Sequence, residues 1–211
     1  MMKGIRFGTI HSFDDLHLVL STMKIPPAKP KTSFIDLPGA DGSVDLTEAF
    51  GRVKYSNREA SFTFTVLPNQ DFEQIKRFVC GKINGSKMKI LVEKDPDYFW
   101  NGRCYVDEYN SDAALNQIVV AAILDPYKLK ETETFSFSSS TDERNADFYI
   151  KGDFPVTLEW QFTKETSIKI GTDLQKFSSG KYRMYDIEPG AFNFTYSSDG
   201  DFAVAYQERA L

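Results

Sequence analysis

Apolar and polar side chains alternate along much of this chain with the period of two that is typical of half-buried β-strands. Segments 88–92 and 98–106 follow this pattern, whereas segment 118–124 is apolar throughout and predicts a central strand covered on both faces. The clearest alternating positions are Leu16, Leu18 and Leu20; Phe62, Phe64 and Val66; and Val156, Leu158, Trp160 and Phe162. The protein is therefore predicted to be mainly β.

One helix is expected to interrupt the strands after Pro68 and Asn69, with Asn69 as the N-terminal cap. The helix should end at Gly81, because glycine favours helix termination. Its apolar side is predicted to consist of Phe72, Ile75, Phe78 and Val79.

Asp125-Pro126 marks the expected domain boundary, because the apolar strand stops there and a residue before proline is pushed toward extended geometry. Residues 1–125 are predicted to form an N-terminal β-sandwich that carries the one helix, and residues 126–211 a smaller antiparallel β-sandwich. Aromatic residues alternate in 192–196 and again in 202–206, on either side of Ser198-Asp199-Gly200, which predicts a hairpin.

Asp41-Gly42 lies between extended runs that end at Leu37 and begin near Ser43, so it predicts a hairpin or short loop. Glycine accepts the positive φ that tight connections require. Asp41 and Asp45 could instead bind calcium, but the loop lacks the further acidic positions and the bidentate Glu of an EF-hand.

The composition narrows the class of protein. A content of 18 Phe and 10 Tyr supplies ample material for a packed core, and the longest apolar run, 118–124, is far too short to span a bilayer. Residues 1–10 show no secretory signal. The net charge is −5 and no basic cluster is present, which argues against a nucleic-acid-binding protein.

The two cysteines, Cys80 and Cys104, are expected to be free thiols.

Candidate catalytic groups are few. His11 and His17 lie six residues apart, on an expected turn and strand, and the structural interpretation is favoured for both. Asp14-Asp15 and the acidic residues around Pro96 are expected to be solvated turn residues. No G-x-S-x-G elbow or Cys–His arrangement is present, and the segment GKINGSK lacks the order of a phosphate-binding loop. We therefore predict no enzyme activity, no cofactor and no metal.

Trp160 is the aromatic residue that could stack on a saccharide. It lies in phase with Leu158 and Phe162, however, so the pattern favours a place in the core. The H-x-N-P-R pattern of galectins is absent.

The first third of the chain carries an unusual order of turn residues. Proline residues precede the second strand, and a glycine-rich turn precedes a short polar motif. The positions are His11, Ser12, Phe13 and Asp14; Pro26-Pro27 and Pro30; the segment 37–47, with Gly39, Asp41 and Gly42; and Tyr55, Ser56, Asn57 and Arg58. In this order the chain resembles the distal tail proteins, the Dit family, of long-tailed phages that infect Gram-positive bacteria.

The second block carries weaker signs of the same family. They are the FPVTLEW strand, the turn at Ile187-Glu188-Pro189-Gly190 and the closing FAVAYQERAL. The resemblance implies a galectin-like or carbohydrate-module-like fold for this block.

The resemblance also implies a structural role in the virion, at the distal tail tip, after assembly in the host cytoplasm. Copies would form a homo-hexameric ring through the N-terminal domains. The ring would join the tail tube protein to the tail fibre or tail-associated lysin and to receptor-binding proteins, and DNA would pass through its channel. The motif residues named above are then candidate interface positions. A carbohydrate-binding adhesion module and a capsid or tail-tube subunit are the alternatives.

Overall fold

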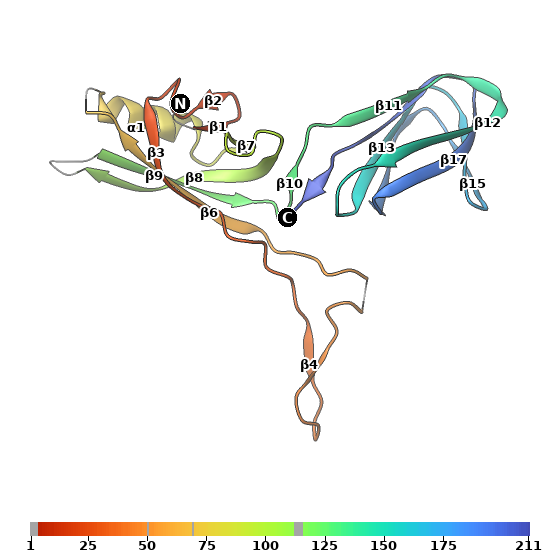
Figure 1. Cartoon of the computed structure of the whole chain (residues 1–211), viewed down its shortest axis with the longest axis horizontal. Helices are drawn as coiled ribbons and strands as arrows, with labels where there is room; N and C mark the ends of the chain where they lie inside the picture. The colour runs from red at the N-terminus through yellow and green to blue at the C-terminus, as the bar shows by residue number, and fades with distance from the viewer. Residues whose placement is uncertain (1–3, 50, 69, 112–115) are drawn as a thin grey trace. The chain divides into compact units, whose positions relative to one another are not determined.

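The computed structural model describes residues 4–49, 51–68, 70–111 and 116–211 (Figure 1). The chain divides into two compact units, residues 1–128 with Leu211 and residues 129–210. Strands dominate both units, and α1 (Phe72–Lys82) is the one α-helix among the described residues. The chain is thus mainly β, as the alternation predicts, and belongs to the β-sandwich class.

Seven strands of the first unit pair antiparallel in one continuous sheet. The order is β2 (Ile10–His11), β1 (Ile5–Phe7), β7 (Lys87–Val92), β8 (Phe99–Ser111), β9 (Asn116–Leu124), β6 (Arg58–Val66) and β3 (Leu18–Lys24).

This sheet curls back on itself. Strands β1 and β6 are four strand spacings apart, which in a flat sheet would be about 19 Å. The ring of Phe7 on β1 nevertheless lies 5.8 Å from the ring of Phe62 and 6.1 Å from the ring of Phe64, both on β6. Strands β1 and β6, each next to one end of this order, therefore face each other across a shared core.

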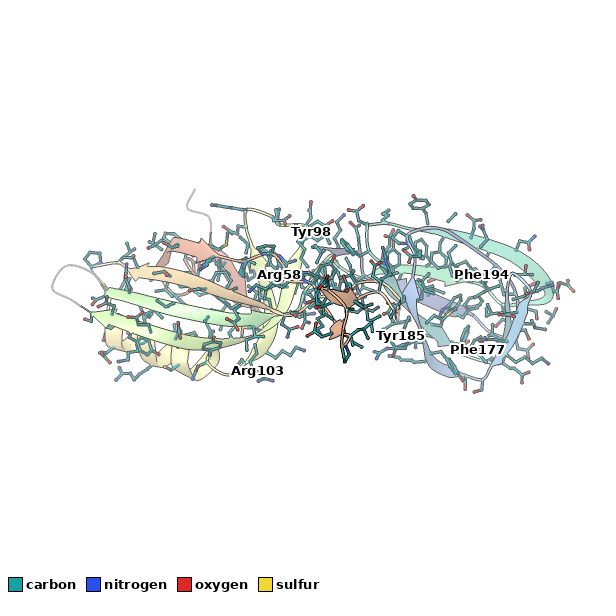
Figure 2. All side chains as sticks on the ribbon, turned by 90° about the horizontal axis from the view of Figure 1, so that it is seen from below. Arg58, Tyr98, Arg103, Phe177, Tyr185 and Phe194 are labelled. Atoms are coloured by element: carbon teal, nitrogen blue, oxygen red, sulfur yellow. The ribbon has the colours of Figure 1, made fainter. Side chains whose placement is uncertain are left out.

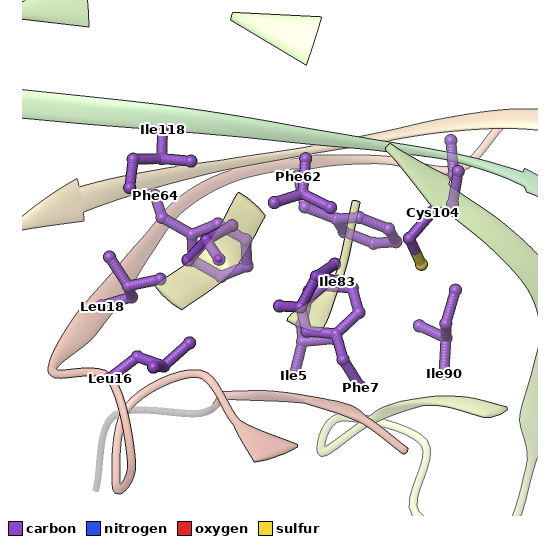
Figure 3. Packing of buried hydrophobic residues seen from close by; sticks show 14 of the residues in the cluster. Ile5, Phe7, Leu16, Leu18, Phe62, Phe64, Ile83, Ile90, Cys104 and Ile118 are labelled. Atoms are coloured by element: carbon purple, nitrogen blue, oxygen red, sulfur yellow. The ribbon is translucent and has the colours of Figure 1, made fainter. Parts of the chain in front are cut away.

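Figure 3 shows this core, in which Phe7, Phe62 and Phe64 meet Ile83 and Cys104. Strand β6 follows the predicted period of two, with its alternate apolar residues buried. Strand β9 lies between β8 and β6, as expected of a central strand, but the prediction that both faces are covered is wrong. Ile123 on its outer face is 44% exposed, because no second layer covers it.

The first predicted strand begins later than its pattern indicates. Strand β3 starts at Leu18, and Leu16 lies in the turn before it, where it is buried all the same. His17, expected on the strand, precedes it with a φ of 51°. The positive φ of His17 turns the chain so that Leu16 and Leu18 on either side of it are both buried, although Leu16 is not part of a strand.

Helix α1 is capped by Asp71, whose carboxylate accepts a hydrogen bond from the Gln74 N–H at 3.0 Å. The predicted cap, Asn69, lies outside the described residues, and the cap is instead Asp71, two positions later. Gly81 lies inside the helix, which ends one residue later, and the Ile83 N–H closes its last turn on the Val79 carbonyl.

The predicted apolar side of α1 is confirmed for Phe72, Ile75 and Val79, which pack on the core. It is wrong for Phe78, which is 42% exposed. Although Phe78 follows Ile75 by three residues, its position on the helix lies at the edge of the buried apolar face, so its side chain reaches solvent.

Between β3 and β6 the chain forms a separate hairpin of β4 (Phe34–Asp36) and β5 (Ser43–Asp45), labelled β4 in Figure 1. The predicted turn at Asp41-Gly42 joins these two strands and is confirmed. We call residues 26–57 the arm.

The second unit is a sandwich of two four-stranded antiparallel sheets. One has the order β11 (Glu133–Phe137), β18 (Phe202–Tyr206), β13 (Val156–Phe162) and β16 (Gly180–Ile187). The other has the order β12 (Ser140–Ile150), β17 (Gly190–Ser198), β14 (Thr166–Ile170) and β15 (Asp173–Phe177). The short strands β10 (Lys128–Leu129) and β19 (Arg209–Ala210) pair with each other.

The predicted hairpin of 192–196 and 202–206 is wrong. Strands β17 and β18 lie in opposite sheets, and Ser198-Asp199-Gly200 carries the chain from one sheet to the other. Aromatic residues of the two strands contact each other across the sandwich instead, and the Tyr196 and Phe202 rings pack edge-on with their centres 4.9 Å apart.

Replacement of Phe62 by Ala tests the closure of the first unit. Phe62 is completely buried, so Phe62→Ala should lower the free energy of opening of β6 and β9 by about 3–5 kcal/mol. Amide hydrogen exchange of these strands measures that loss. Phe34→Ala, which removes the same ring from a side chain that is 57% exposed, should change the exchange of these strands by less than about 0.5 kcal/mol. Equal effects of the two variants would contradict the assigned core.

Candidate functional site: motif residues and the arm

His11 is a buried structural residue at the start of the motif His11-Ser12-Phe13-Asp14. Its Nδ1 lies 3.0 Å from the Asp14 backbone N and 3.1 Å from Asp14 Oδ2, and its Nε2 lies 3.1 Å from Glu93 Oε1. The backbone N–H of His11 donates to the Asp15 carboxylate at 2.6 Å. Every polar group of the residue is thereby held, which supports the structural interpretation favoured from the sequence.

The rest of the motif fastens the first strand to the sheet. Ser12 Oγ accepts a hydrogen bond from the Ile5 N–H at 3.0 Å, and Glu93 Oε2 accepts one from the Gly4 N–H at 2.6 Å. A side chain at Gly4 would meet the His11 ring at 2.5 Å, so only glycine fits there. Phe13 is half-buried.

Glu93 was not predicted as part of this cluster, because it lies 82 residues from its partner His11. The hydrogen bond from the Gly4 N–H holds the pKa of the Glu93 carboxyl below its usual value, and the interactions with His11 and Arg6 act in the same direction. Partial burial opposes this shift.

The base of the arm is fixed by Arg58, labelled in Figure 2, which is 7% exposed. Its Nε donates to the Pro126 carbonyl at 2.9 Å and its Nη1 to the Pro26 carbonyl at 3.4 Å. The guanidinium thus ties the beginning of the arm to the segment that follows β9. Burial lowers the pKa of Arg58, since the charged form loses hydration.

The two sides of the arm pair close to this base. The Lys31 N–H donates to the Lys54 carbonyl at 2.7 Å, and the Ser56 N–H donates to the Lys29 carbonyl at 2.8 Å. The Tyr55 ring packs edge-on against Tyr127 at 6.0 Å.

The tip of the arm is a hairpin with two residues of positive φ, Gly39 at 84° and Gly42 at 75°. Both glycines have open space around the position of a Cβ, so the backbone conformation alone explains them. Asp41 is exposed at the same turn.

All residues from 29 to 45 are exposed, although several are apolar. Ile35 and Val44 stand directly opposite each other across the hairpin and are 47% and 45% exposed. Phe34 and Leu37 are more than half exposed. An isolated two-stranded hairpin is marginal in water, and adjacent exposed apolar side chains mark an interaction surface.

Short polar contacts hold the arm together in place of a core. Thr47 Oγ1 accepts from the Ser33 N–H at 3.1 Å, and the Leu46 N–H donates to the Ser33 carbonyl at 2.8 Å. Asp45 accepts from the Thr47 N–H at 2.8 Å, and its hydrogen bonds with Thr47 lower the pKa of the Asp45 carboxyl.

The predicted motif positions therefore fall into three places, not one. His11, Ser12 and Asp14 form the cluster at Glu93, and Tyr55 and Arg58 lie at the base of the arm. The glycine-rich turn forms the tip, and Asn57 is exposed near the base. The first two of these places position the sheet and the arm, and the hairpin of the arm carries exposed apolar side chains, among them Ile35 and Val44.

The thiols and acidic residues considered from the sequence have structural surroundings. Cys80 and Cys104 are both free. Burial raises the pKa of the Cys104 thiol to about 12, which makes it unreactive, and Cys80 contacts the Tyr109 hydroxyl. Asp95 pairs with Lys128 at 2.6 Å. Among the described residues no group of three or more His, Cys, Asp or Glu side chains is placed to hold a metal.

Trp160 lies in the core of the second unit and is 3% exposed, which confirms the core position that its alternation with Leu158 and Phe162 favours over stacking on a saccharide. Its ring packs edge-on against Phe194 at 5.3 Å, across the two sheets. In the part of the chain that the structure describes, no helix is both long and apolar enough to cross a membrane.

A curled N-terminal sheet with one helix and an arm, followed by a small β-sandwich, is the fold of the described residues. No family model matches the chain, and no curated protein matches it. Among solved structures, the fold is similar to that of SPP1 Dit (gp 19.1), described as a paradigm of the hub adsorption apparatus in phages that infect Gram-positive bacteria. The match covers 100% of both chains with a TM-score of 0.65 and 12% sequence identity.

This protein therefore has a Dit-like fold over its whole length. Two further matches, a de novo designed double-stranded β-helix and the insecticidal crystal protein Cry2Aa, have TM-scores of only 0.25 and 0.21 and do not share this fold.

The hold of Arg58 on the arm can be tested with Arg58→Met, which keeps the length of the side chain and removes its donors. The Pro26 and Pro126 carbonyls lose their partner, so the arm base should be destabilised by about 1–3 kcal/mol. Faster amide exchange at Lys31 and Ser56 measures this loss. Lys24→Ala, which removes an exposed cation before the arm, should leave both rates unchanged. If Arg58→Met also leaves them unchanged, Arg58 does not hold the arm.

The lowered pKa of Glu93 predicts a dependence of stability on pH. The ionised carboxyl stabilises the folded state above its ordinary pKa of 4.5, and this contribution disappears as the pH falls through the lower folded-state value. Glu93→Gln should therefore be less stable than the natural protein at about pH 7, and the difference should shrink toward about pH 3. Amide exchange of β1 and thermal unfolding measure it. A difference that is constant over this range would refute the assigned role.

Proposed function

We propose that this protein is the distal tail hub of a long-tailed phage. Copies close into a homo-hexameric ring through the first unit, and DNA passes through the central channel during injection. The Dit-like fold, which spans both chains of the comparison completely, supports the class of protein. The exposed apolar arm is the observation that carries the ring.

The arm supports assembly because its own chain leaves it uncovered. Ile35 and Val44 form an apolar pair on a hairpin whose residues are exposed without a break from 29 to 45. In a cyclic ring each contact is heterologous, so the arm of one copy meets a different surface on its neighbour. Burial of the four apolar side chains of the hairpin would supply about 25 cal/mol per Å² of apolar surface removed from water.

The channel is proposed to have a neutral or acidic wall. The net charge of −5 and the lack of a basic cluster along the sequence support this assignment. DNA carries one negative charge per roughly 1.7 Å of duplex, so a basic wall would bind it and slow its passage.

The domains of the sequence prediction, residues 1–125 and 126–211, take different roles in this proposal. The first forms the ring, which contacts the tail tube protein and the tail fibre or tail-associated lysin. The second, a galectin-like sandwich, docks receptor-binding or other baseplate proteins. The protein acts by its shape at the distal tail tip of the virion, after assembly in the host cytoplasm, and catalyses no reaction.

Charge on the arm should prevent the ring. Ile35→Asp combined with Val44→Asp places two carboxylates where the proposed contact requires apolar surface, so hexamers should give way to monomers. Native mass spectrometry and negative-stain electron microscopy measure the species present. Leu174→Asp, a matched change at a side chain that is 58% exposed on the second unit, should leave the hexamer intact.

The natural protein must itself form six-membered rings, alone or with its tail partners. A natural protein that stays monomeric in both conditions contradicts the proposal, and so do hexamers that persist when both arm residues are changed.

A further inference from the structure

The two sheets of the second unit end on the same side of the sandwich, and a small pocket opens between their edges. Among the described residues β16 pairs only with β13, and β15 pairs only with β14, so both are edge strands. The pocket has a volume of about 140 Å³. Its lining combines Met184 of β16 with Asp173 and Gln175 of β15, and with Trp160, Ile168 and Ile170 from the strands behind them. We call it the edge pocket.

The edge pocket has the size and the walls of a site for one ring. Ile168, Ile170 and Met184 are apolar, and Phe177, labelled in Figure 2, adds an aromatic side chain to the lining. In another protein an engineered cavity of about 150 Å³ with similar walls binds benzene. A single six-membered ring therefore fits between the edges of the two sheets.

The wall of the pocket includes a hydrogen-bond donor that the fold does not use. Trp160 is 3% exposed, and its Nε1 has no hydrogen-bond partner among the described residues. A buried donor without a partner is unfavourable. A ligand that brings an acceptor to this indole N–H therefore gains more than its apolar contacts alone provide.

Two polar side chains of β15 face the same interior. Asp173 pairs with Ile170 and Gln175 with Ile168 in the ladder, so their side chains share the face of these isoleucines. Both polar residues are exposed. The carboxylate accepts hydrogen bonds, and the amide both donates and accepts. A hydroxyl on the bound ring can then accept from the indole N–H and donate to one of these side chains, which makes a phenol the best match.

The two edges next to the pocket differ in their ability to accept another strand. All five residues of β15 pair with β14 without a shift in register, and its other side is unpaired among the described residues. Strand β16 is interrupted, since three residues from Met184 to Ile187 oppose two of β13, and Asp186 has a φ of 55°. A bulge bends an edge and prevents further pairing. An incoming strand therefore fits β15.

We propose that β15 and the edge pocket bind an extended segment of a partner protein, which adds as a fifth strand and inserts a tyrosine ring between the sheets. Backbone pairing with β15 supplies affinity, and the pocket supplies specificity. Leu174, which is 58% exposed on β15, adds apolar contact on the outer face. This inference rests on the docking role proposed for the second unit and gives the chemistry that the partner brings.

The test uses the full-length protein and an array of seven-residue peptides of alternating threonine and valine, in which the central residue is varied. The tyrosine peptide should bind about threefold to tenfold more tightly than the phenylalanine peptide, because only tyrosine brings the hydroxyl. The alanine peptide should bind more weakly still. In an NMR titration with the tyrosine peptide, the indole N–H signal of Trp160 and the amides of Leu174 and Lys176 should shift.

Variants of the protein separate the hydroxyl from the ring. Trp160→Phe keeps an aromatic side chain and removes the donor, so it should bind the tyrosine and phenylalanine peptides nearly equally. Asp173→Ala changes an exposed residue and should reduce the same preference without affecting the fold. Trp100→Phe is the matched control, since it removes another buried, unpartnered indole N–H, in the first unit. It should keep the full preference for tyrosine.

Several results would overturn the site: no preference for the tyrosine peptide, a preference that persists in both Trp160→Phe and Asp173→Ala, or shifts on another surface. Free 4-methylphenol that binds as tightly as the tyrosine peptide would exclude strand addition. Native mass spectrometry of the same samples reports the ring separately. Rings without peptide binding contradict the edge pocket alone, and peptide binding without rings contradicts the ring alone.

Discussion

The first unit depends on the contact of Phe7 with Phe62 and Phe64, because this contact brings two distant strands of one sheet together. Helix α1 packs its apolar side against the core of this curled sheet. It also places the start of β6, and with it Arg58, at the root of the arm. Strand β6 therefore determines both the packing of the core and the position of the exposed hairpin. Its inward side chains are apolar, and its first residue, Arg58, is a buried cation.

The second unit uses its aromatic residues differently. Trp160, Phe162, Phe194 and Phe202 fill the space between two sheets, and their rings contact across that space. Because side chains of a strand alternate between faces, the order of these inward rings also sets which residues face outward. The outward positions of Ala203 and Ala205 on β18 follow from the same register as the core.

Much of the fold could be predicted from local pattern. Phe62, Phe64 and Val66 were expected on one face of a strand, and Asp41-Gly42 in a turn, because both signals lie within a few neighbouring residues. Phe78 and Ile123 were misplaced, since apolar character does not reveal whether a second layer covers a face. Two aromatic strands joined by Ser198-Asp199-Gly200 look the same in sequence whether they pair edge to edge or face each other.

In the candidate site too, local sequence pattern predicts some features and others depend on the fold. The motif residues could be found by their order, but their partners could not. Glu93 and the carbonyls of Pro26 and Pro126 become neighbours of His11 and Arg58 only through the fold.

The pairing of β11 with β18 has a consequence for synthesis of the protein. These strands join residues 133–137 to residues 202–206, so the first sheet of the sandwich cannot close until residue 206 has left the ribosome. The strands of the first unit that form its core are complete by Leu124. During translation the two units therefore mature in sequence, and the aromatic side chains of the later one stay unburied until residue 206 has emerged.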